Sequence, residues 1–262
     1  MPVELNIRIC GLKENVLTVR DTIRMLLRLH DNPSPIVLLP LPYLDYNFKR
    51  GLSSNPASPF VVPKTWNAPF DVYREVTLCK DSDEYSDVKA SVVRRTGFHL
   101  NILEIIRIQN PTQYKKYAQT LWKVAKRLQQ DKSEVFKSAL FHGTKKTSAF
   151  EIAKSNYSLE YCGRNGSLLG RGIYFSVCAQ YSSNSRFASP TEDHEQVMLW
   201  NRVVTGKSCL GASKMTAPPY ATMTDRFDSV VDIEHDPAVY AVFDNSFIYP
   251  EYIIRFRPVG SL

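Results

Sequence analysis

Apolar residues recur along most of the chain in patterns that switch between helix and strand. Residues 81–84 (Asp-Ser-Asp-Glu) place acidic groups at the start of a predicted helix, where the N-terminal dipole favours them. A β-branched run at 102–108 predicts a strand that ends at Asn110-Pro111. Residues 112–130 carry Tyr, Leu, Trp and Ala on one helical face, which predicts a long amphipathic helix.

Short apolar runs separated by turn residues predict that strands dominate from residue 136 onward. Two strands are expected near the end, at 238–243 and 249–257, and the polar Asp244-Asn245-Ser246 between them predicts a hairpin. Helices followed by mostly antiparallel strands with short connections indicate an α+β fold. The other strands are expected at 136–141, 168–176, 196–204 and 229–231, with a helix at 149–157.

The first 70 residues follow a different pattern. One strand at 3–9, one helix at 16–30 and one apolar run at 35–44 are too few elements to close a domain. Residues 45–69 are rich in proline and are the best linker candidate. We therefore expect two parts: 1–70, a partial small α/β segment with a Pro-rich linker, and 71–262, a complete folded domain.

Composition places the chain among ordinary folded proteins. Of its 262 residues, 44% are hydrophobic and 23% are charged. The sequence has no apolar run long enough to cross a bilayer and no secretory signal, so we expect an intracellular protein of the nucleus or cytoplasm with no membrane partner. Its five cysteines are scattered, without a CxxC pair, which argues against a disulfide framework and against any metal site.

The formal charge of +7 favours anionic partners. Basic residues concentrate only at Arg94-Arg95, at Lys145-Lys146 and between residues 115 and 127. Nucleic-acid binding is therefore an alternative that the sequence alone does not support, because it requires the positive residues to gather on one face.

Two glycine-containing apolar motifs carry the strongest chemical signal. Residues 140–144 read Leu-Phe-His-Gly-Thr, and residues 170–176 read Gly-Arg-Gly-Ile-Tyr-Phe-Ser. Each predicts a short buried strand whose backbone comes close to another group. Taken singly, His142 and Tyr174 are more often core residues than site residues. Together they suit a ligand with a flat aromatic ring and a sugar.

These motifs resemble the catalytic domain of the poly(ADP-ribose) polymerase family. Further matches occur in order at 102–111, at Ala179–Ser182, at 227–232 and at 249–254, so the resemblance covers about residues 72–257. The last motifs are similar to those of intracellular members that transfer one ADP-ribose unit. The resemblance implies an ADP-ribosyltransferase fold, with mostly antiparallel strands in packed sheets flanked by helices. It also implies NAD as co-substrate, with 71–262 as the catalytic domain.

The resemblance also implies a role for each site residue. The backbone of Gly143 would grip the nicotinamide carboxamide, where a side chain would block the approach. His142 would bond the adenosine-side ribose hydroxyl, and Thr144 would help to fix the same half of NAD. Tyr174 would stack on the nicotinamide ring, and Ser182 would bond its amide. The ribose–nicotinamide bond would then break through an oxocarbenium-like state.

Two positions depart from the polymerising members of the family. Val239 stands where those members carry a catalytic glutamate, and valine can neither accept a hydrogen bond nor activate a hydroxyl. Ser185 stands where many relatives have a second stacking tyrosine, for which Tyr181 or Phe187 could substitute. We therefore expect a protein mono-ADP-ribosyltransferase, a pentosyltransferase that modifies protein acceptors, itself among them, and releases nicotinamide. The alternative is a catalytically inactive module of the same fold that acts through NAD or protein binding.

Overall fold

A computed structural model of the chain describes residues 62–96, 100–132, 134–163 and 168–259. The strands in this part are Arg74–Thr77 (β1), Leu100–Gln109 (β2), Phe136–Thr144 (β3), Ile173–Ser176 (β4), Gln196–Val204 (β5), Ser208–Leu210 (β6), Ser229–Val231 (β7), Val239–Val242 (β8) and Ile248–Pro258 (β9). The helices are Asp83–Thr96 (α3), Pro111–Leu128 (α4), Lys146–Ser155 (α5) and Ala179–Ser182 (α6), with 3-10 turns at Leu159–Tyr161 (η2) and Asn245–Phe247 (η3).

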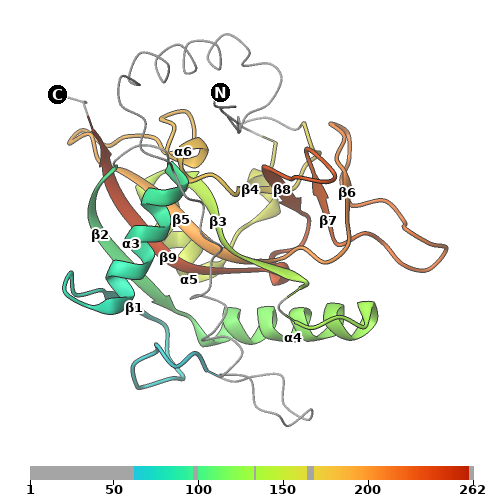
Figure 1. The fold of residues 1–262 in the computed structure, drawn as a ribbon, viewed down its shortest axis with the longest axis horizontal. Coiled ribbons are helices and arrows are strands. Elements are labelled where there is room, and N and C mark those ends of the chain that lie inside the picture. The colour runs from blue at the N-terminus through green and yellow to red at the C-terminus, as the bar shows by residue number, and fades with distance from the viewer. Residues whose placement is uncertain (1–61, 97–99, 133, 164–167, 260–262) are drawn as a thin grey trace, which may run out of the picture. The chain divides into compact units, whose positions relative to one another are not determined.

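The nine strands of the described residues form one hydrogen-bonded sheet in the order β1-β2-β9-β5-β3-β4-β8-β7-β6 (Figure 1). All neighbouring strands are antiparallel except β6 and β7. The expected α+β class is confirmed. The elements expected at 3–9, 16–30 and 35–44 lie outside the described residues. No helix among the described residues is both long and apolar enough to traverse a bilayer.

The sheet consists of two halves that meet at one point. Strands β3 and β4 share a single register pair, Phe141↔Ser176. Strands from both halves nevertheless bury side chains in one apolar cluster, to which Leu199 and Ile253 belong on one side and Phe175 and Val242 on the other. The halves therefore pack against each other, as the expected arrangement of packed sheets requires.

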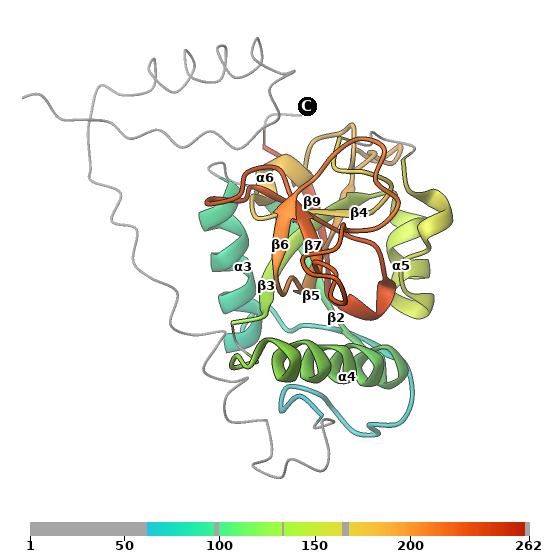
Figure 2. The ribbon, with the colours of Figure 1, turned by 90° about the vertical axis from the view of Figure 1, so that its right-hand side faces the viewer.

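Helices cover both faces of the larger half. Helices α3 and α6 bury Val88, Val92 and Ala179 against Phe141 and Trp200. Helix α5 buries its alanines in the opposite cluster, the one that the two halves share. In Figure 2, α3 and α5 accordingly lie on opposite sides of the strands, and α4 runs beneath them.

Helix α4 has the signals that the sequence predicted. The side chain of Asn110 caps it by accepting a hydrogen bond from the Gln113 N–H, and Pro111 occupies the first turn. Its buried face carries Tyr114 and Tyr117, which pack near Tyr249 and Trp66. Trp66 lies within the segment expected to be a linker, so the end of that segment contributes to the core.

The predicted hairpin between the last two strands is wrong. Strand β8 pairs with β4 and β7, whereas β9 pairs with β2 and β5. Residues Asn245–Phe247 form a 3-10 turn instead, with the Asp244 side chain accepting a hydrogen bond from the Ser246 N–H. The same polar residues that close a hairpin can also cap a short helix, so local chemistry did not distinguish the two.

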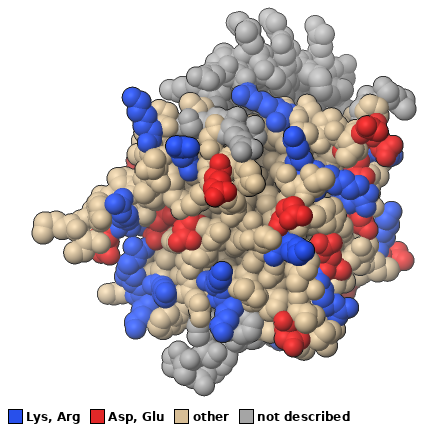
Figure 3. Space-filling view, turned by 180° about the vertical axis from the view of Figure 1, so that it is seen from behind, with Lys and Arg blue, Asp and Glu red and all other residues tan. Residues whose placement is uncertain are grey.

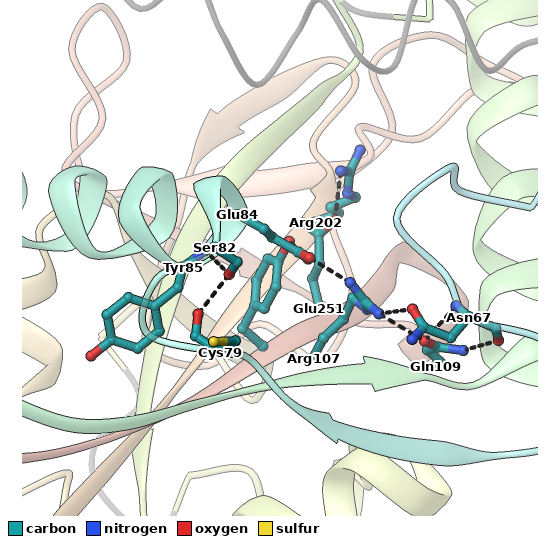
Figure 4. A network of polar contacts seen from close by, with 10 residues as sticks. Asn67, Cys79, Ser82, Glu84, Tyr85, Arg107, Gln109, Arg202 and Glu251 are labelled. Carbon is teal, nitrogen blue, oxygen red and sulfur yellow. Dashed lines mark hydrogen bonds and ion pairs between the residues drawn. The ribbon is translucent and has the colours of Figure 1, made fainter.

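A polar network joins the first strands to the segment before them (Figure 4). Arg107 pairs with Glu84 of α3 and donates to the Asn67 Oδ1 at 2.6 Å and the Gln109 Oε1 at 3.1 Å. Tyr252 of β9 donates to the other oxygen of Glu84 at 2.9 Å. This buried arginine thus finds partners on α3, on the segment before β1 and on its own strand, which compensates for its loss of water.

A second ionic network ties together the strand ends near β3. Arg255 of β9 donates to both carboxylate oxygens of Glu195, at 2.6 and 2.7 Å, and also pairs with Glu104 of β2. Lys146, two residues after β3, lies 3.1 Å from Glu195. The hydrogen bond from Arg255, followed by that from Lys146, lowers the pKa of Glu195 to about 2 despite its burial.

The depressed pKa of Glu195 predicts a pH-dependent contribution to stability. The carboxylate has its ordinary pKa of 4.5 when unfolded, so its contribution is complete above that pH and is lost as the pH falls toward 2. We expect Glu195→Gln to lower the free energy of unfolding at pH 7 by about 1–3 kcal/mol. Urea unfolding of both proteins should show this difference shrinking below pH 4.5, and Glu160→Gln, at an exposed glutamate, should show none. A difference that stays constant with pH would contradict this assignment.

Candidate active site

The two motifs meet where the halves of the sheet separate. Beyond the pair Phe141↔Ser176, β3 and β4 have no further ladder pair. There the Nδ1 of His142 lies 2.8 Å from the backbone oxygen of Tyr174. Since a carbonyl can only accept, the imidazole donates from Nδ1 and leaves Nε2 with a lone pair. The structure therefore brings together the histidine and the tyrosine of the two motifs.

The surroundings of His142 keep its ring neutral and oriented. The ring lies edge-on to Tyr157, with centroids 5.1 Å apart, and tilted against Phe175 at 5.8 Å. Burial lowers the pKa of His142 from its ordinary 6.5, and the hydrogen bond to Tyr174 only partly opposes this shift. At neutral pH the residue is thus an uncharged hydrogen-bond acceptor at Nε2.

A buried side-chain pair supports His142 from behind, and sequence reasoning missed it. The Tyr157 hydroxyl donates to the Asn201 Oδ1 at 2.8 Å. The Asn201 amide in turn donates to the backbone oxygens of Leu140 and Leu199, at 3.0 and 3.1 Å. Asn201 is fully buried. Its signal in the sequence is an amide directly after the four apolar residues 197–200 of β5.

Gly143 is required by a close approach within the protein itself. A Cβ at this position would lie 2.0 Å from the backbone oxygen of Ser182 and 3.0 Å from the Ala188 nitrogen. No other residue fits without moving α6. The glycine thus brings the end of α6 onto β3. Ser182 is only 3% exposed, and its hydroxyl makes no hydrogen bond to another residue in the described ranges.

Tyr174 is fixed at its hydroxyl end. The hydroxyl accepts from the Leu169 N–H at 2.7 Å and donates to the Gly170 oxygen at 2.8 Å. Gly170 has φ of +98°, a conformation that glycine adopts freely, so residues 168–172 turn around the phenol instead of extending the strand as expected. Burial, opposed by the Leu169 contact, raises the pKa of Tyr174 to about 12, and the phenol stays protonated.

Val239 lies in an apolar cluster on the same face as Tyr174. It is 4% exposed and packs with Leu169, Val230 and Ala241. Its neighbouring carboxylate is Asp232, whose Oδ1 accepts three backbone N–H groups at 3.0 Å and so fixes the start of β8. That oxygen is fully occupied by structural hydrogen bonds, and Val239 itself has no polar atom in its side chain.

Glu251 belongs to β9 and not to this site. It lies at a bulge between β5 and β9 and pairs with Arg202 at 2.6 Å (Figure 4). Burial of both side chains makes this pair a structural contact. Within the described ranges, no group of three or more His, Cys, Asp or Glu side chains is arranged to hold a metal ion.

The remaining predicted residues lie close in the chain but are less firmly tied to the site. Thr144 pairs with Val197 of β5, and its hydroxyl has no hydrogen bond to the rest of the described chain. Ser185 is exposed. The rings of Tyr181, just before Ser182, and Phe187, five residues after it, have centroids 4.9 Å apart and an interplanar angle of 32°. Aromatic surface is therefore available near the position where Ser185 provides none.

Chemically, this arrangement can bind and orient a polar ligand. It offers a neutral imidazole acceptor at His142, a hydroxyl at Ser182 and a fixed aromatic ring at Tyr174. Val239 supplies no proton acceptor beside them. These groups can therefore orient a ligand, and none of the four residues carries a carboxylate for general-base chemistry.

Comparison with known proteins identifies the family of the chain. A family model described as the poly(ADP-ribose) polymerase catalytic domain matches residues 82–258. The chain is 32% identical over 185 residues, 70% of its length, to the human protein mono-ADP-ribosyltransferase PARP14. It is 29% identical over 217 residues, 81% of its length, to mouse PARP12, and 30% identical over 219 residues, 75% of its length, to mouse PARP11.

These relatives extend well beyond the matched region. The match covers 10% of PARP14, 30% of PARP12 and 65% of PARP11. The family model spans α3 through β9 of this chain, which includes every strand of the described sheet except β1 and every residue of the candidate site. The chain therefore belongs to the poly(ADP-ribose) polymerase catalytic-domain family.

Proposed function

We propose that this protein transfers one ADP-ribose unit from NAD to protein acceptors and releases nicotinamide. The observation that carries the proposal is the hydrogen bond from His142 Nδ1 to the Tyr174 oxygen. It leaves Nε2 of the neutral ring as an acceptor for a hydroxyl group. The three relatives described above are named protein mono-ADP-ribosyltransferases, and the family takes NAD as its substrate. The four cysteines of the described residues carry thiols and not disulfides, which fits an intracellular location.

We assign one half of NAD to each part of the site. The Nε2 of His142 would accept from a ribose hydroxyl on the adenosine side, with Thr144 beside it. The backbone of Gly143 and the hydroxyl of Ser182 would bond the nicotinamide amide, and Tyr174 would stack on the ring. The contact between Gly143 and Ser182 supports this pairing, because it holds both groups together before any ligand arrives.

Bound in this way, NAD supplies a ribosyl carbon that exchanges its bond to nicotinamide for a bond to an acceptor atom. An acceptor that carries a proton on its attacking atom would need a base to remove it. Because Val239 is apolar, we propose that the acceptor's own carboxylate serves as the attacking group and carries no proton at neutral pH. A ribose hydroxyl, which requires deprotonation, would then be a poor acceptor, and transfer would stop after one unit.

The second candidate is an inactive module of the same fold that binds NAD or protein. Val239 and the exposed Ser185 favour it, because the first removes a catalytic carboxylate and the second a stacking ring. His142, Gly143 and Tyr174 favour the enzyme. Thermal unfolding with NAD and labelling with radioactive NAD distinguish the two, because a module that binds NAD is stabilised without becoming labelled.

Replacement of His142 tests the proposed binding mode. We expect His142→Ala to abolish labelling by radioactive NAD and to remove the stabilisation by NAD, because the variant loses the acceptor at Nε2. The variant also loses the bond to Tyr174, worth about 1 kcal/mol, so its own melting temperature should fall slightly. Wild-type labelling should persist down to pH 6.5, since the lowered pKa keeps the ring neutral there.

Tyr157→Phe is the matched control for this variant. It removes the hydroxyl bond to Asn201 and destabilises the same region, but it leaves both nitrogens of His142 in place. Labelling by Tyr157→Phe at wild-type rates would show that the loss of labelling in His142→Ala comes from the missing imidazole and not from lower stability. Wild-type labelling by His142→Ala would rule out the proposed role of the histidine.

A carboxylate at position 239 tests why transfer stops. We expect Val239→Glu to lower stability by about 2–4 kcal/mol, because the new carboxyl enters an apolar cluster. Burial also raises the pKa of a glutamate in such surroundings, so it stays protonated and the product remains a single unit. Gel electrophoresis of labelled protein measures the number of units attached. Val239→Thr, in which the side chain keeps the size of valine but gains a hydroxyl, is the control. A ladder of polymer from the wild type would contradict single transfer.

A further inference from the structure

Helix α4 presents a solvent face that carries only positive charge. The helix contains Lys115, Lys116, Lys123, Lys126 and Arg127 and no Asp or Glu. All five cations are exposed, because the opposite face of the helix packs into the core. The basic residues between 115 and 127, one of the concentrations noted in the sequence, therefore lie together on one surface. Such a face lacks the acidic partners that usually accompany lysines on a solvated helix.

A second segment extends this face at the end of α4. The guanidinium of Arg127 donates to both oxygens of Asp228, at 2.5 and 2.6 Å, and to the backbone oxygen of Arg226 at 3.2 Å. The Lys207 N–H donates to the same carboxylate at 2.9 Å. Asp228 is buried, so its charge is satisfied internally. The backbone at Lys207 and Arg226 is thereby held beside the end of the helix, and both side chains are exposed there.

Aromatic rings alternate with these cations. The Lys126 ammonium lies 5.1 Å from the Trp122 ring, and the Arg226 guanidinium lies 3.9 Å from the ring of Tyr220. Tyr220 is 59% exposed. Of the three tryptophans, Trp66 and Trp200 are buried, whereas Trp122 is partly accessible. We call Trp122, Lys123, Lys126, Lys207, Tyr220 and Arg226 the basic–aromatic face.

Acidic groups near this face are fewer than the basic ones. Asp131 and Glu134 follow the helix, and Asp225 precedes Arg226. Seen from behind, blue side chains gather at the lower left of the molecule, the side on which the end of α4 and the loop between β6 and β7 lie in that view (Figure 3). The surface therefore has a local excess of positive charge that attracts a polyanion.

We propose that the basic–aromatic face binds single-stranded nucleic acid. Phosphates would pair with the lysines and arginine, and unpaired bases would stack on Trp122 and Tyr220. Bases in a duplex are stacked on one another and cannot reach these rings, whereas the carboxylates of an acidic protein would engage only the cations. The face does not include any residue assigned to NAD, so the inference does not rest on the proposed transferase activity.

Fluorescence anisotropy of the full chain with a labelled oligouridylate of about 20 nucleotides tests this binding, at a length that exceeds one typical site. We expect a dissociation constant of about 10⁻⁴ to 10⁻⁶ M at physiological salt, with tighter binding at low salt. The logarithm of affinity should fall with that of salt by about 0.7 per contacted phosphate. Tryptophan emission should be quenched, because Trp122 is the accessible tryptophan. No binding at low salt would overturn the proposal.

Charge reversal locates the site. Lys123→Glu with Lys126→Glu should weaken binding at least about tenfold. The slope of log affinity against log salt should become shallower by about 1.4, which corresponds to the loss of two phosphate contacts. Lys89→Glu with Lys154→Glu makes the same change of charge at exposed positions on α3 and α5 and should leave the binding nearly unchanged. Equal losses in the two double variants would mean that only net charge matters, and this would overturn the assignment.

Stacking is tested separately from charge. Trp122→Ala should weaken binding between about fivefold and a hundredfold and abolish the quenching, whereas Trp122→Phe should retain most of the affinity. A polyglutamate peptide should not compete with the oligonucleotide. Competition at equal concentration would identify the face as a site for acidic protein and would overturn the nucleic-acid proposal. His142→Ala should bind the oligonucleotide normally, which separates this inference from the proposed enzyme.

Discussion

The rest of the site depends on the bond between the His142 imidazole and the Tyr174 backbone. Strands β3 and β4 share one ladder pair, so this side chain replaces the main-chain bonds that would otherwise hold the two halves of the sheet at this point. One ring nitrogen is used for structure, and the other is thereby fixed as an acceptor. The architecture of the sheet and the acceptor of the candidate site are consequently coupled through one imidazole ring.

Most elements of the fold could be predicted because their signals are local. Strands β5 and β7 have the predicted bounds, and the Asn110 cap and the acidic first turn placed α4 and α3. Strand order could not be predicted in the same way. The partners of β8 and β9 are distant in sequence, and the side chains between the two strands suit a hairpin and a 3-10 turn equally well.

The candidate site shows the same division. The motifs and the resemblance they carry predicted His142, Gly143, Tyr174 and Ser182 as one group, and the structure places them at one junction. Their supports were not predicted. Asn201 matters because its amide satisfies a carbonyl at a bulge, and the need for a glycine at 143 comes from a carbonyl of α6. Both depend on contacts between segments that only the folded chain brings together.

Strand β9 is the last strand of the described sheet to be made, yet it lies in the middle of the larger half of the sheet. It lies between β2 and β5, although its residues follow those of every other strand in the described part of the chain. During synthesis, β2 and β5 therefore expose a hydrogen-bonding edge and apolar side chains until residue 258 has been made. The larger half of the sheet therefore cannot be completed before β9 has been made, and an unpaired strand edge persists until then.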